Sequence, residues 1–205
     1  MSHVMIDLET LGTGYDAAIV AIGAVQFDPH APEGTLGPTF YERITVNSAL
    51  AAGTLDASTL LWWMEQSDAA RRSTFSGPAK PLLTVLAEFN RFIVLVAGMS
   101  NVTSEHVHVW GNGATFDNVV LRSAFRAAKL IPTWGFRFDR CYRTLANLLP
   151  AARRPQFVNY AVPHNALDDA IAQARHLQKV YAALGLSTAP VLTREQHYAA
   201  MAETP

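Results

Sequence analysis

Short runs of apolar residues open the chain and predict β-strands. Residues 3–8 are almost continuously apolar, which is typical of a strand buried on both faces. Residues 19–27 form a second run, and residues 39–46 form a third that is rich in the tyrosine, threonine and isoleucine residues that strands favour. Because short connections join the three runs, we expect them to pair as an antiparallel meander.

Apolar residues recur at helical spacing through most of the remaining chain. We predict helices at residues 55–72, 82–96, 115–130, 140–149 and 165–184, with a further strand at 107–110. The last helix has the clearest pattern, and Gly185 ends it. Strands followed by an alternation of strand and helix predict an α/β fold. In this fold a central mixed sheet, antiparallel first and then parallel, is flanked by helices.

No repeat, low-complexity tract or linker divides the sequence. We therefore expect a single domain over residues 1–205, with a core at about 3–185 and a C-terminal extension at 186–205 that contains a short helix. Hydrophobic residues make up 50% of the chain and charged residues 16%, as in folded globular proteins. The formal net charge of -1 gives the molecule no general attraction for polyanions, so a nucleic-acid site must be local.

The cysteine content and the N-terminal residues bear on location. Cys141 is the only cysteine, which excludes an intrachain disulfide and suits a reducing cytoplasm. The opening residues MSHVMIDLETLG lack the basic and apolar segments of a signal peptide. The longest apolar run, residues 92–99, is too short to span a bilayer. We expect a soluble, cytoplasmic protein with no membrane partner.

Two acidic residues stand near the end of the first predicted strand. Asp7 and Glu9 are two positions apart, so their carboxylates lie on the same side of the strand, close to the turn at Gly12. Unpaired charge is costly to bury in an apolar strand, and a bound cation is one way to offset that cost. The alternative is a strand end that points into solvent.

Further acidic residues stand at the starts of two predicted helices. Asp117 follows a Gly-Asn-Gly break, and Asp169 lies in the sequence HNALDDA, five positions after His164. The ordinary alternative is that the helix macrodipole favours acids in a first turn. In HNALDDA, Asn165 is a candidate N-cap and Asp168 a second acid of the first turn.

Taken together, these residues supply the parts of a two-metal phosphodiester hydrolase. Hard divalent cations such as Mg²⁺ take oxygen ligands. Two of them about 4 Å apart can activate a water molecule and stabilise a leaving oxygen. Four carboxylates can hold such a pair, and a histidine without a metal role can accept the proton of the attacking water. The candidates are Asp7, Glu9, Asp117 and Asp169 for the metals and His164 for the proton.

The sequence resembles the DEDDh 3′–5′ exonucleases, a superfamily with a ribonuclease H-like fold. Three motifs carry the resemblance, IDLETLG, GNGATFDN and HNALDDA, and it extends over residues 3 to about 185. The stretch LLWWMEQSDAAR at residues 60–71 is similar to a branch from phages and bacteria. That branch contains exodeoxyribonuclease VIII-like proteins and exoribonucleases related to ribonuclease T.

The resemblance implies a role for each central residue. Asp7 would bridge two divalent cations, Mg²⁺ or Mn²⁺, and Glu9 would bind one of them and the 3′-terminal hydroxyl. Asp117 would reach its ion through water, and Asp169 would bind directly. His164 would be the general base. Because all five positions match, the resemblance implies an active enzyme.

Several residues are candidate substrate contacts. The resemblance implies that Thr10 and Leu11 contact the terminal nucleotide, Leu11 by packing on its base. The adjacent tryptophans at 62 and 63 face different directions on a helix, so we expect one in the core and the other available to stack on a base. Gln66 is a base-edge contact or a solvated side chain. The candidates are Thr10, Leu11, Trp63, Gln66 and Asn112.

A basic stretch extends over residues 119–155, where eight arginines and lysines stand against Asp139 alone. These residues either contact backbone phosphates behind the scissile bond or are ordinary solvated residues on helices.

The sequence therefore predicts an enzyme that hydrolyses single-stranded nucleic acid from its 3′ end to nucleoside 5′-monophosphates. One alternative is a phosphodiesterase for small oligonucleotides, and another is a non-catalytic nucleic-acid-binding module. RNA and DNA stay open as substrates, because the choice depends on a contact to the 2′-hydroxyl. Relatives are commonly dimers, so we expect a homodimer.

Overall fold

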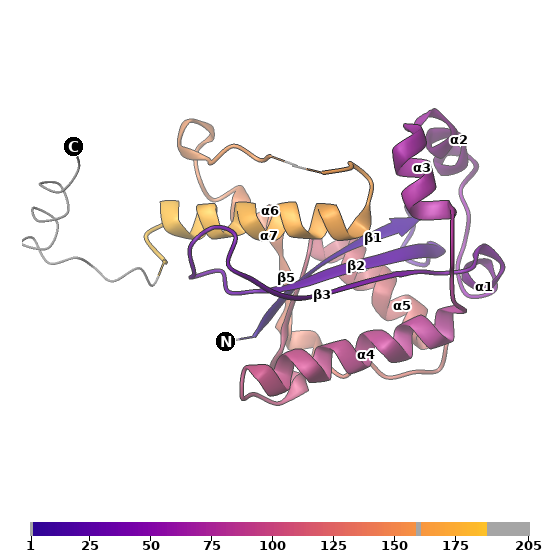
Figure 1. The fold of residues 1–205 in the computed structure, drawn as a ribbon, viewed down its shortest axis with the longest axis horizontal. Helices are drawn as coiled ribbons and strands as arrows, with labels where there is room; N and C mark the ends of the chain where they lie inside the picture. Colours follow the sequence, from indigo (N-terminus) through magenta and orange to yellow (C-terminus); the bar gives the residue numbers. More distant parts are fainter. Residues whose placement is uncertain (1, 159–160, 188–205) are drawn as a thin grey trace, which may run out of the picture.

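A single five-stranded sheet lies at the centre of the computed structural model, which describes residues 2–158 and 161–187 (Figure 1). Its order is β3-β2-β1-β4-β5, so the first strand is central. The strands are β1 His3–Thr10, β2 Ile19–Phe27, β3 Leu36–Arg43, β4 His108–Gly111 and β5 Asp139–Cys141. The predicted α/β architecture with a mixed sheet is confirmed.

The predicted antiparallel meander is also confirmed, because β2 pairs antiparallel with both β1 and β3. The third strand lies three residues earlier than predicted, at Leu36–Arg43 instead of residues 39–46. Leu36 already pairs with Phe27 across an irregularity in β2, and Ile44 leaves the strand for an isolated bridge to Lys80. Pairing with β2 therefore decides where this strand begins and ends.

The second half of the sheet is parallel. β4 pairs parallel with β1, and β5 pairs parallel with β4. β5 was not predicted, because it has only three residues and two of them are charged. The predicted helix at residues 140–149 is shortened accordingly to Tyr142–Ala146.

The helices are α1 Val46–Leu50, α2 Ala57–Glu65, α3 Asp68–Phe75, α4 Leu82–Met99, α5 Val119–Ala127, α6 Tyr142–Ala146 and α7 Ala166–Ala183. Short turns of other helix types are the 3₁₀ turns Ser104–His106, Phe136–Phe138 and Ala151–Arg153 and the π-turn Ala114–Asn118.

Two of the predicted helices are divided. The helix predicted at residues 55–72 becomes α2 and α3, because Gln66 and Ser67 adopt extended backbone between them. Ser67 caps α3 by accepting a hydrogen bond from the Ala70 backbone N–H at 3.2 Å. The helix predicted at residues 115–130 is a π-turn followed by α5. The helix predicted within 186–205 lies almost entirely outside the described residues.

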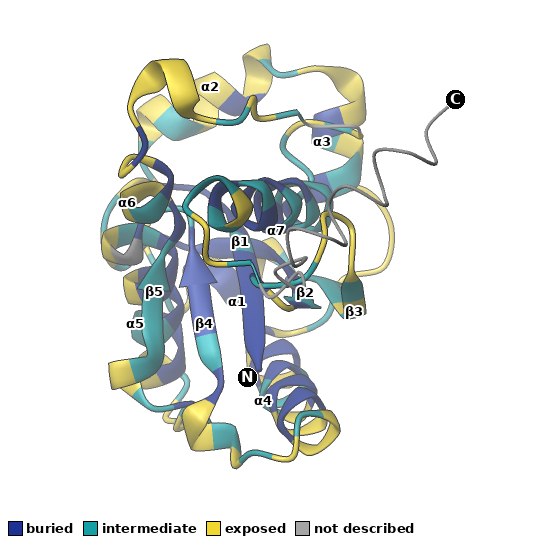
Figure 2. Cartoon of the chain, turned by 90° about the vertical axis from the view of Figure 1, so that its left-hand side faces the viewer, coloured by how far each residue is buried: buried dark blue, intermediate teal, exposed yellow. Residues whose placement is uncertain are grey.

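Helices cover both faces of the sheet (Figures 1 and 2). α7 packs on one face over a cluster that includes Met5 and Trp110, while α4 and α5 pack on the other with Ile6 and Phe89. Alternate residues of β1 therefore enter two separate cores. α2 and α3 form a further layer beyond the carboxyl end of β1 (Figure 1).

α4 is the one helix of the described chain that is long and apolar enough to cross a membrane by length and composition. The run at residues 92–99 is its second half, and Glu88, Asn90 and Arg91 separate that run from the apolar residues of the first half. One side of α4 is buried against the sheet, including Leu86, Phe89 and Ile93, which are completely inaccessible to solvent. This packing accounts for much of its apolar character.

Candidate active site

Asp7 and Glu9 lie on the face of β1 that α7 covers. His3 and Met5 precede them on the same face at intervals of two residues. Asp7 is partly buried, and Glu9 is only 6% exposed. The two carboxylates are therefore enclosed by the protein and do not form a solvated strand end.

The start of α7 approaches the sheet very closely. Asn165 caps this helix, because its side chain accepts hydrogen bonds from the backbone N–H groups of Leu167 at 3.0 Å and Asp168 at 3.1 Å. Gly23, which is paired with Asp7 in the sheet, leaves the space that the helix occupies. A β-carbon at Gly23 would lie 2.1 Å from the carbonyl carbon of Ala166. The close approach therefore requires glycine at this position.

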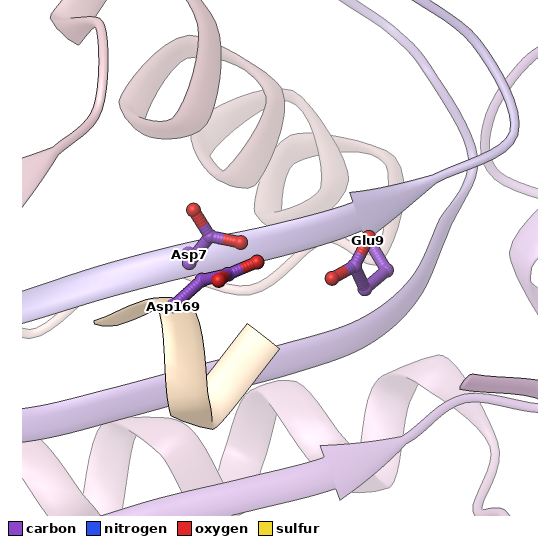
Figure 3. Close-up of side chains that lie close together, drawn as sticks. All are labelled: Asp7, Glu9 and Asp169. Atoms are coloured by element: carbon purple, nitrogen blue, oxygen red, sulfur yellow. The ribbon is translucent and has the colours of Figure 1, made fainter. Parts of the chain in front are cut away.

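Asp169, in the first turn of α7, joins the two carboxylates of β1 (Figure 3). One carboxylate oxygen from each of Asp7, Glu9 and Asp169 lies within 4.8 Å of the other two. Asp169 Oδ2 accepts a hydrogen bond from the backbone N–H of His164 at 3.0 Å. One helical turn further on, Gln173 Nε2 donates to Asp7 Oδ1 at 2.8 Å. These bonds orient the carboxylates within the group.

Asp117 lies on the π-turn that follows β4 and is 3% exposed. Asn118 anchors the turn by donating its side-chain N–H to the carbonyl of Val109 at 3.0 Å. Gly111 makes room, because a β-carbon there would lie 2.8 Å from the β-carbon of Asp117. Asp117 is not one of the three clustered carboxylates, but its negative charge is among the influences that raise the pKa of Asp7.

The surroundings of these carboxylates disfavour their ionised forms and raise their pKa values. Burial raises the pKa of Glu9 to about 8 and that of Asp117 to about 7. Burial, followed by the charges of the neighbouring acids, raises the pKa of Asp7 well above its usual value. Glu9 Oε1 and Asp117 Oδ2 are buried and have no hydrogen-bond partner among the described protein atoms. Hard oxygen donors with excess negative charge and unused lone pairs fit divalent cations well.

His164 lies on the turn before α7, in the left-handed backbone region with φ at +62°. Its carbonyl accepts a hydrogen bond from Thr74 Oγ1 of α3 at 3.3 Å. Its imidazole packs edge-on against Trp62 and Trp63 of α2, with ring centroids 4.9 and 6.4 Å apart. The candidate base is therefore held by the α2–α3 layer as well as by α7.

A cleft of about 400 Å³, here called the proximal cleft, opens beside Glu9. Thr10 lines it, as do the tryptophans of α2. Trp62 is 40% exposed, whereas Trp63 is 3% exposed and donates its Nε1–H to the Thr10 carbonyl at 2.9 Å. The pair is divided into a buried and an exposed residue as expected. However, the exposed ring belongs to Trp62 and not to Trp63, the stacking candidate.

Three other candidate substrate contacts lie outside the lining of the proximal cleft. Leu11 is 3% exposed and lines a separate apolar pocket of about 310 Å³. Gln66 donates its side-chain N–H to the Trp62 carbonyl at 3.0 Å at the end of α2. The backbone of Asn112 is among the influences that lower the pKa of Asp117, against the larger effect of burial. Substrate contact by these side chains stays a prediction.

The sequence patterns did not single out Gln173, and Trp63 was the candidate chosen from the tryptophan pair although Trp62 is the exposed one. The spacing of four residues between Asp169 and Gln173 on one helix was a usable signal, because such residues share a face. No local signal distinguishes Trp62 from Trp63. The basic stretch is also divided by the fold, since Arg122 pairs with Asp139 at 2.7 Å and is not available for phosphates.

A family model described as the 3′–5′ exoribonuclease Rv2179c-like domain matches residues 2–181. The chain is also 28% identical over 135 residues to the exodeoxyribonuclease of Enterobacteria phage T4. That alignment covers 62% of this chain and 56% of the phage protein, so the chain matches little more than half the length of that curated relative.

Solved structures share the fold at low sequence identity. The nuclease domain of 3′hExo, a DEDDh family member bound to rAMP, has a TM-score of 0.55 and 14% identity, covering 88% of this chain and 92% of that one. The zinc-ion-bound complex of E. coli ExoI with single-stranded DNA has a TM-score of 0.61 and 13% identity, covering 98% of this chain and 44% of that one. The expected ribonuclease H-like fold is confirmed.

Proposed function

Because the chain belongs to the Rv2179c-like family of 3′–5′ exoribonuclease domains, we propose that it removes nucleoside 5′-monophosphates from the 3′ end of single-stranded RNA with the help of two divalent cations. Membership of this family supports 3′–5′ exonuclease activity on nucleic acid, and the three sequence motifs support the DEDDh type. The number of cations, the choice of sugar and the residue roles are the proposal.

The enclosed group of Asp7, Glu9 and Asp169, with Asp117 beside it, is the main support for this function. Its raised pKa values and unpartnered oxygens fit two cations of the Mg²⁺ or Mn²⁺ type. Two such cations, when bound, would lower the pKa of a water molecule and stabilise negative charge on the leaving oxygen. The relative described as a zinc-ion-bound complex supports metal binding at this fold.

The protein groups have separate tasks in this proposal. His164 accepts the proton of the attacking water, because its backbone N–H bonds Asp169 Oδ2 and its imidazole packs against Trp62, which lines the proximal cleft. Glu9 faces both the carboxylate group and the proximal cleft, so it contacts a cation and the 3′-terminal hydroxyl. Gln173 keeps Asp7 oriented toward the cations.

The proximal cleft accommodates the terminal nucleotide. It adjoins Glu9, and the exposed ring of Trp62 gives it an aromatic wall on which a base can stack. Thr10 lies at the same edge. The nuclease domain of 3′hExo is described as bound to rAMP, which supports binding of a single nucleotide by a protein of this fold.

RNA is the first substrate to test, because the family is described by exoribonuclease activity. DNA is the necessary comparison, since the phage relative is named an exodeoxyribonuclease. The test uses matched RNA and DNA strands labelled at the 5′ end, with Mg²⁺, Mn²⁺ or a chelator. We expect a ladder that shortens from the 3′ end, faster for RNA, and no shortening with chelator. Faster cleavage of DNA would overturn the choice of sugar.

Two neighbouring residues of α7 give a matched test of the site. Asp169→Asn should abolish cleavage, because it removes a charged ligand oxygen. Asp168→Asn should leave cleavage nearly intact, because Asp168 Oδ2 instead accepts a hydrogen bond from the Val162 backbone N–H at 3.3 Å. Equal activity in both variants would contradict the proposed ligand set, and equal melting temperatures would show that the fold survives.

A small-oligonucleotide phosphodiesterase is the second candidate, because the proximal cleft has a volume of about 400 Å³ and borders the reacting group directly. A chain-length series distinguishes the two functions. Preference for dinucleotides over longer strands would favour the second candidate. The homodimer and the cytoplasmic location stay predictions, and sedimentation would measure the first.

A further inference from the structure

A second cleft, here called the distal cleft, has a volume of about 420 Å³ and lies far from the carboxylate group. His3, at the start of β1, lines it, whereas Asp7 and Glu9 stand four and six residues further along the same strand. At about 3.3 Å per residue, these separations are about 13 and about 20 Å. The distal cleft is bordered by α6 and by Tyr181 near the end of α7.

The distal cleft is on the same face of the sheet as the carboxylates. Met5 of β1 pairs with Trp110 of β4, and Trp110 pairs with Arg140 of β5. Paired residues of neighbouring strands point to the same side. Trp110 and Arg140 line the distal cleft and therefore share the face that carries Asp7.

Arg140 brings a positive charge that no carboxylate neutralises among residues 2–158 and 161–187. The neighbouring carboxylate of Asp139 is bound by Arg122, at 2.7 and 2.9 Å. One guanidinium nitrogen of Arg140 donates to the carbonyls of Arg137 at 2.8 Å and Asp139 at 3.0 Å. The other side-chain N–H donors of Arg140 have no partner among these residues, so the guanidinium suits an anion.

The walls of the distal cleft are aromatic. The rings of His3 and His108 stack with centroids 4.6 Å apart and 10° between their planes, and Trp110 and Tyr181 meet edge-on at 6.5 Å. His3 Nδ1 accepts a hydrogen bond from Trp110 Nε1 at 2.9 Å, so the neutral ring carries its proton on Nε2. That buried nitrogen has no partner among the described protein atoms. The distal cleft therefore combines aromatic surface, a cation and few acceptors.

We propose that the distal cleft binds a nucleotide unit, with the base against its aromatic walls and the phosphate on Arg140. The proposal rests on the proposed function, because it takes the ligand from the same class of substrate. We assign the unit to the substrate strand, upstream of the scissile bond. The sheet supports this, because its strand pairing places the distal cleft and the carboxylates on one face.

The test compares Arg140→Gln with Arg137→Gln, which removes the same charge from an exposed residue outside the lining of the distal cleft. Cleavage is measured on a series from dinucleotides to long strands. Arg140→Gln should raise KM for long strands about fourfold at 0.15 M salt and lower the salt slope by about 0.7, the value for one phosphate contact on a single strand. Dinucleotide cleavage and the Arg137→Gln variant should be unchanged.

A second variant guards against a local change of structure at Arg140. Thr144→Trp, at an exposed position of α6 that lines the distal cleft, should fill it and raise KM for long strands only. Unchanged KM for long strands in both variants would overturn assignment to the strand. Loss of equilibrium binding of free AMP in Arg140→Gln, with an unchanged length series, would instead assign the distal cleft to the released mononucleotide.

These outcomes are separate from failure of the proposed function. If the wild-type protein cleaves neither dinucleotides nor long strands with Mg²⁺ or Mn²⁺, the exonuclease proposal fails before the length comparison begins. If the wild type cleaves both and Arg140→Gln alters neither cleavage nor AMP binding, the distal-cleft proposal alone is wrong.

Discussion

Gln173 Nε2 donates a hydrogen bond to Asp7 Oδ1 at 2.8 Å, across 166 positions of sequence. Gln173 is 3% exposed, and its other polar side-chain atom, Oε1, has no hydrogen-bond partner among the described protein atoms. The bond occupies one oxygen of Asp7 and leaves the carboxylate with a fixed orientation. Metal sites commonly depend on such neighbours to aim their ligands.

Replacement of this glutamine should therefore impair catalysis more than folding. Gln173→Leu is expected to lower kcat/KM about 10- to 100-fold, the usual effect of losing a group that orients a metal ligand. The control is Gln178→Leu, because the side chain of Gln178 in the same helix bonds the carbonyls of Asp28 and Thr35 and the Gly34 N–H, away from the carboxylate group. That change should cost about 1–3 kcal/mol of stability with kcat preserved. The reverse pattern would contradict the role given to Gln173.

The stability of the metal-free protein should fall as pH rises. The pKa of Asp117 is raised to about 7 and that of Glu9 to about 8, above the value of about 4 expected in the unfolded chain. Between about pH 4 and pH 8 the folded state therefore binds more protons than the unfolded state. The stability that these protons provide is lost as the pH rises through the pKa values of the folded state. The slope approaches about 1.4 kcal/mol per pH unit for each retained proton.

Thermal unfolding in chelator at a series of pH values measures this effect. Added Mg²⁺ should reduce the loss, because a bound cation stabilises the ionised carboxylates. Asp117→Asn should make the metal-free profile flatter, since one of the raised groups is gone. A melting temperature that increases between pH 5 and pH 9 without metal would be incompatible with the buried carboxylate group.

Trp62 should affect the chemical step as well as binding. Its ring contacts the imidazole of His164 at 4.9 Å and also lines the proximal cleft. Trp62→Ala is expected to lower kcat about tenfold, part of the contribution of a positioned base, and to raise KM. Trp62→Phe should recover most of kcat, because a smaller aromatic ring keeps an edge contact. Leu61→Ala, at a 61% exposed neighbour outside the cleft lining, is the control.

A kinetic split decides between the two roles of Trp62. If Trp62→Ala changes KM and leaves kcat at the wild-type value, the residue serves only as a wall of the proximal cleft. If kcat falls and phenylalanine restores it, the contact with His164 matters for catalysis.

Gly23 should be intolerant of even a methyl group. Gly23→Ala places a β-carbon 2.1 Å from the Ala166 backbone, so the start of α7 must move. We expect a loss of about 1–3 kcal/mol from overpacking and a fall in kcat, because Asp169 moves with the helix. Gly98→Ala is the matched control: a β-carbon there meets nothing within 4 Å, and helix propensity predicts a gain of about 1 kcal/mol. Chemical denaturation of both variants checks the difference, and equal stabilities would show that α7 can shift freely.

Features that depend on local patterns could be predicted from the amino-acid sequence alone. Residues two apart in a strand share a side, so Asp7 and Glu9 were placed together before any contact was known. The cap at Asn165 could also be predicted, because a capping side chain bonds backbone N–H groups only two and three residues further on. The three motifs also indicated the fold and the class of enzyme.

Features that depend on residues far apart in the sequence became visible in the folded structure. Pairing with β4 created the three-residue strand β5, whose own sequence has no strand pattern. Packing exposed Trp62 and buried Trp63, and it brought Gln173 to Asp7. Within the described part of the chain it also left Arg140 without a carboxylate partner, while Arg122 pairs with Asp139. The physical reason is that periodicity fixes the side of an element on which a residue lies. What it meets there depends on the element that packs against that side.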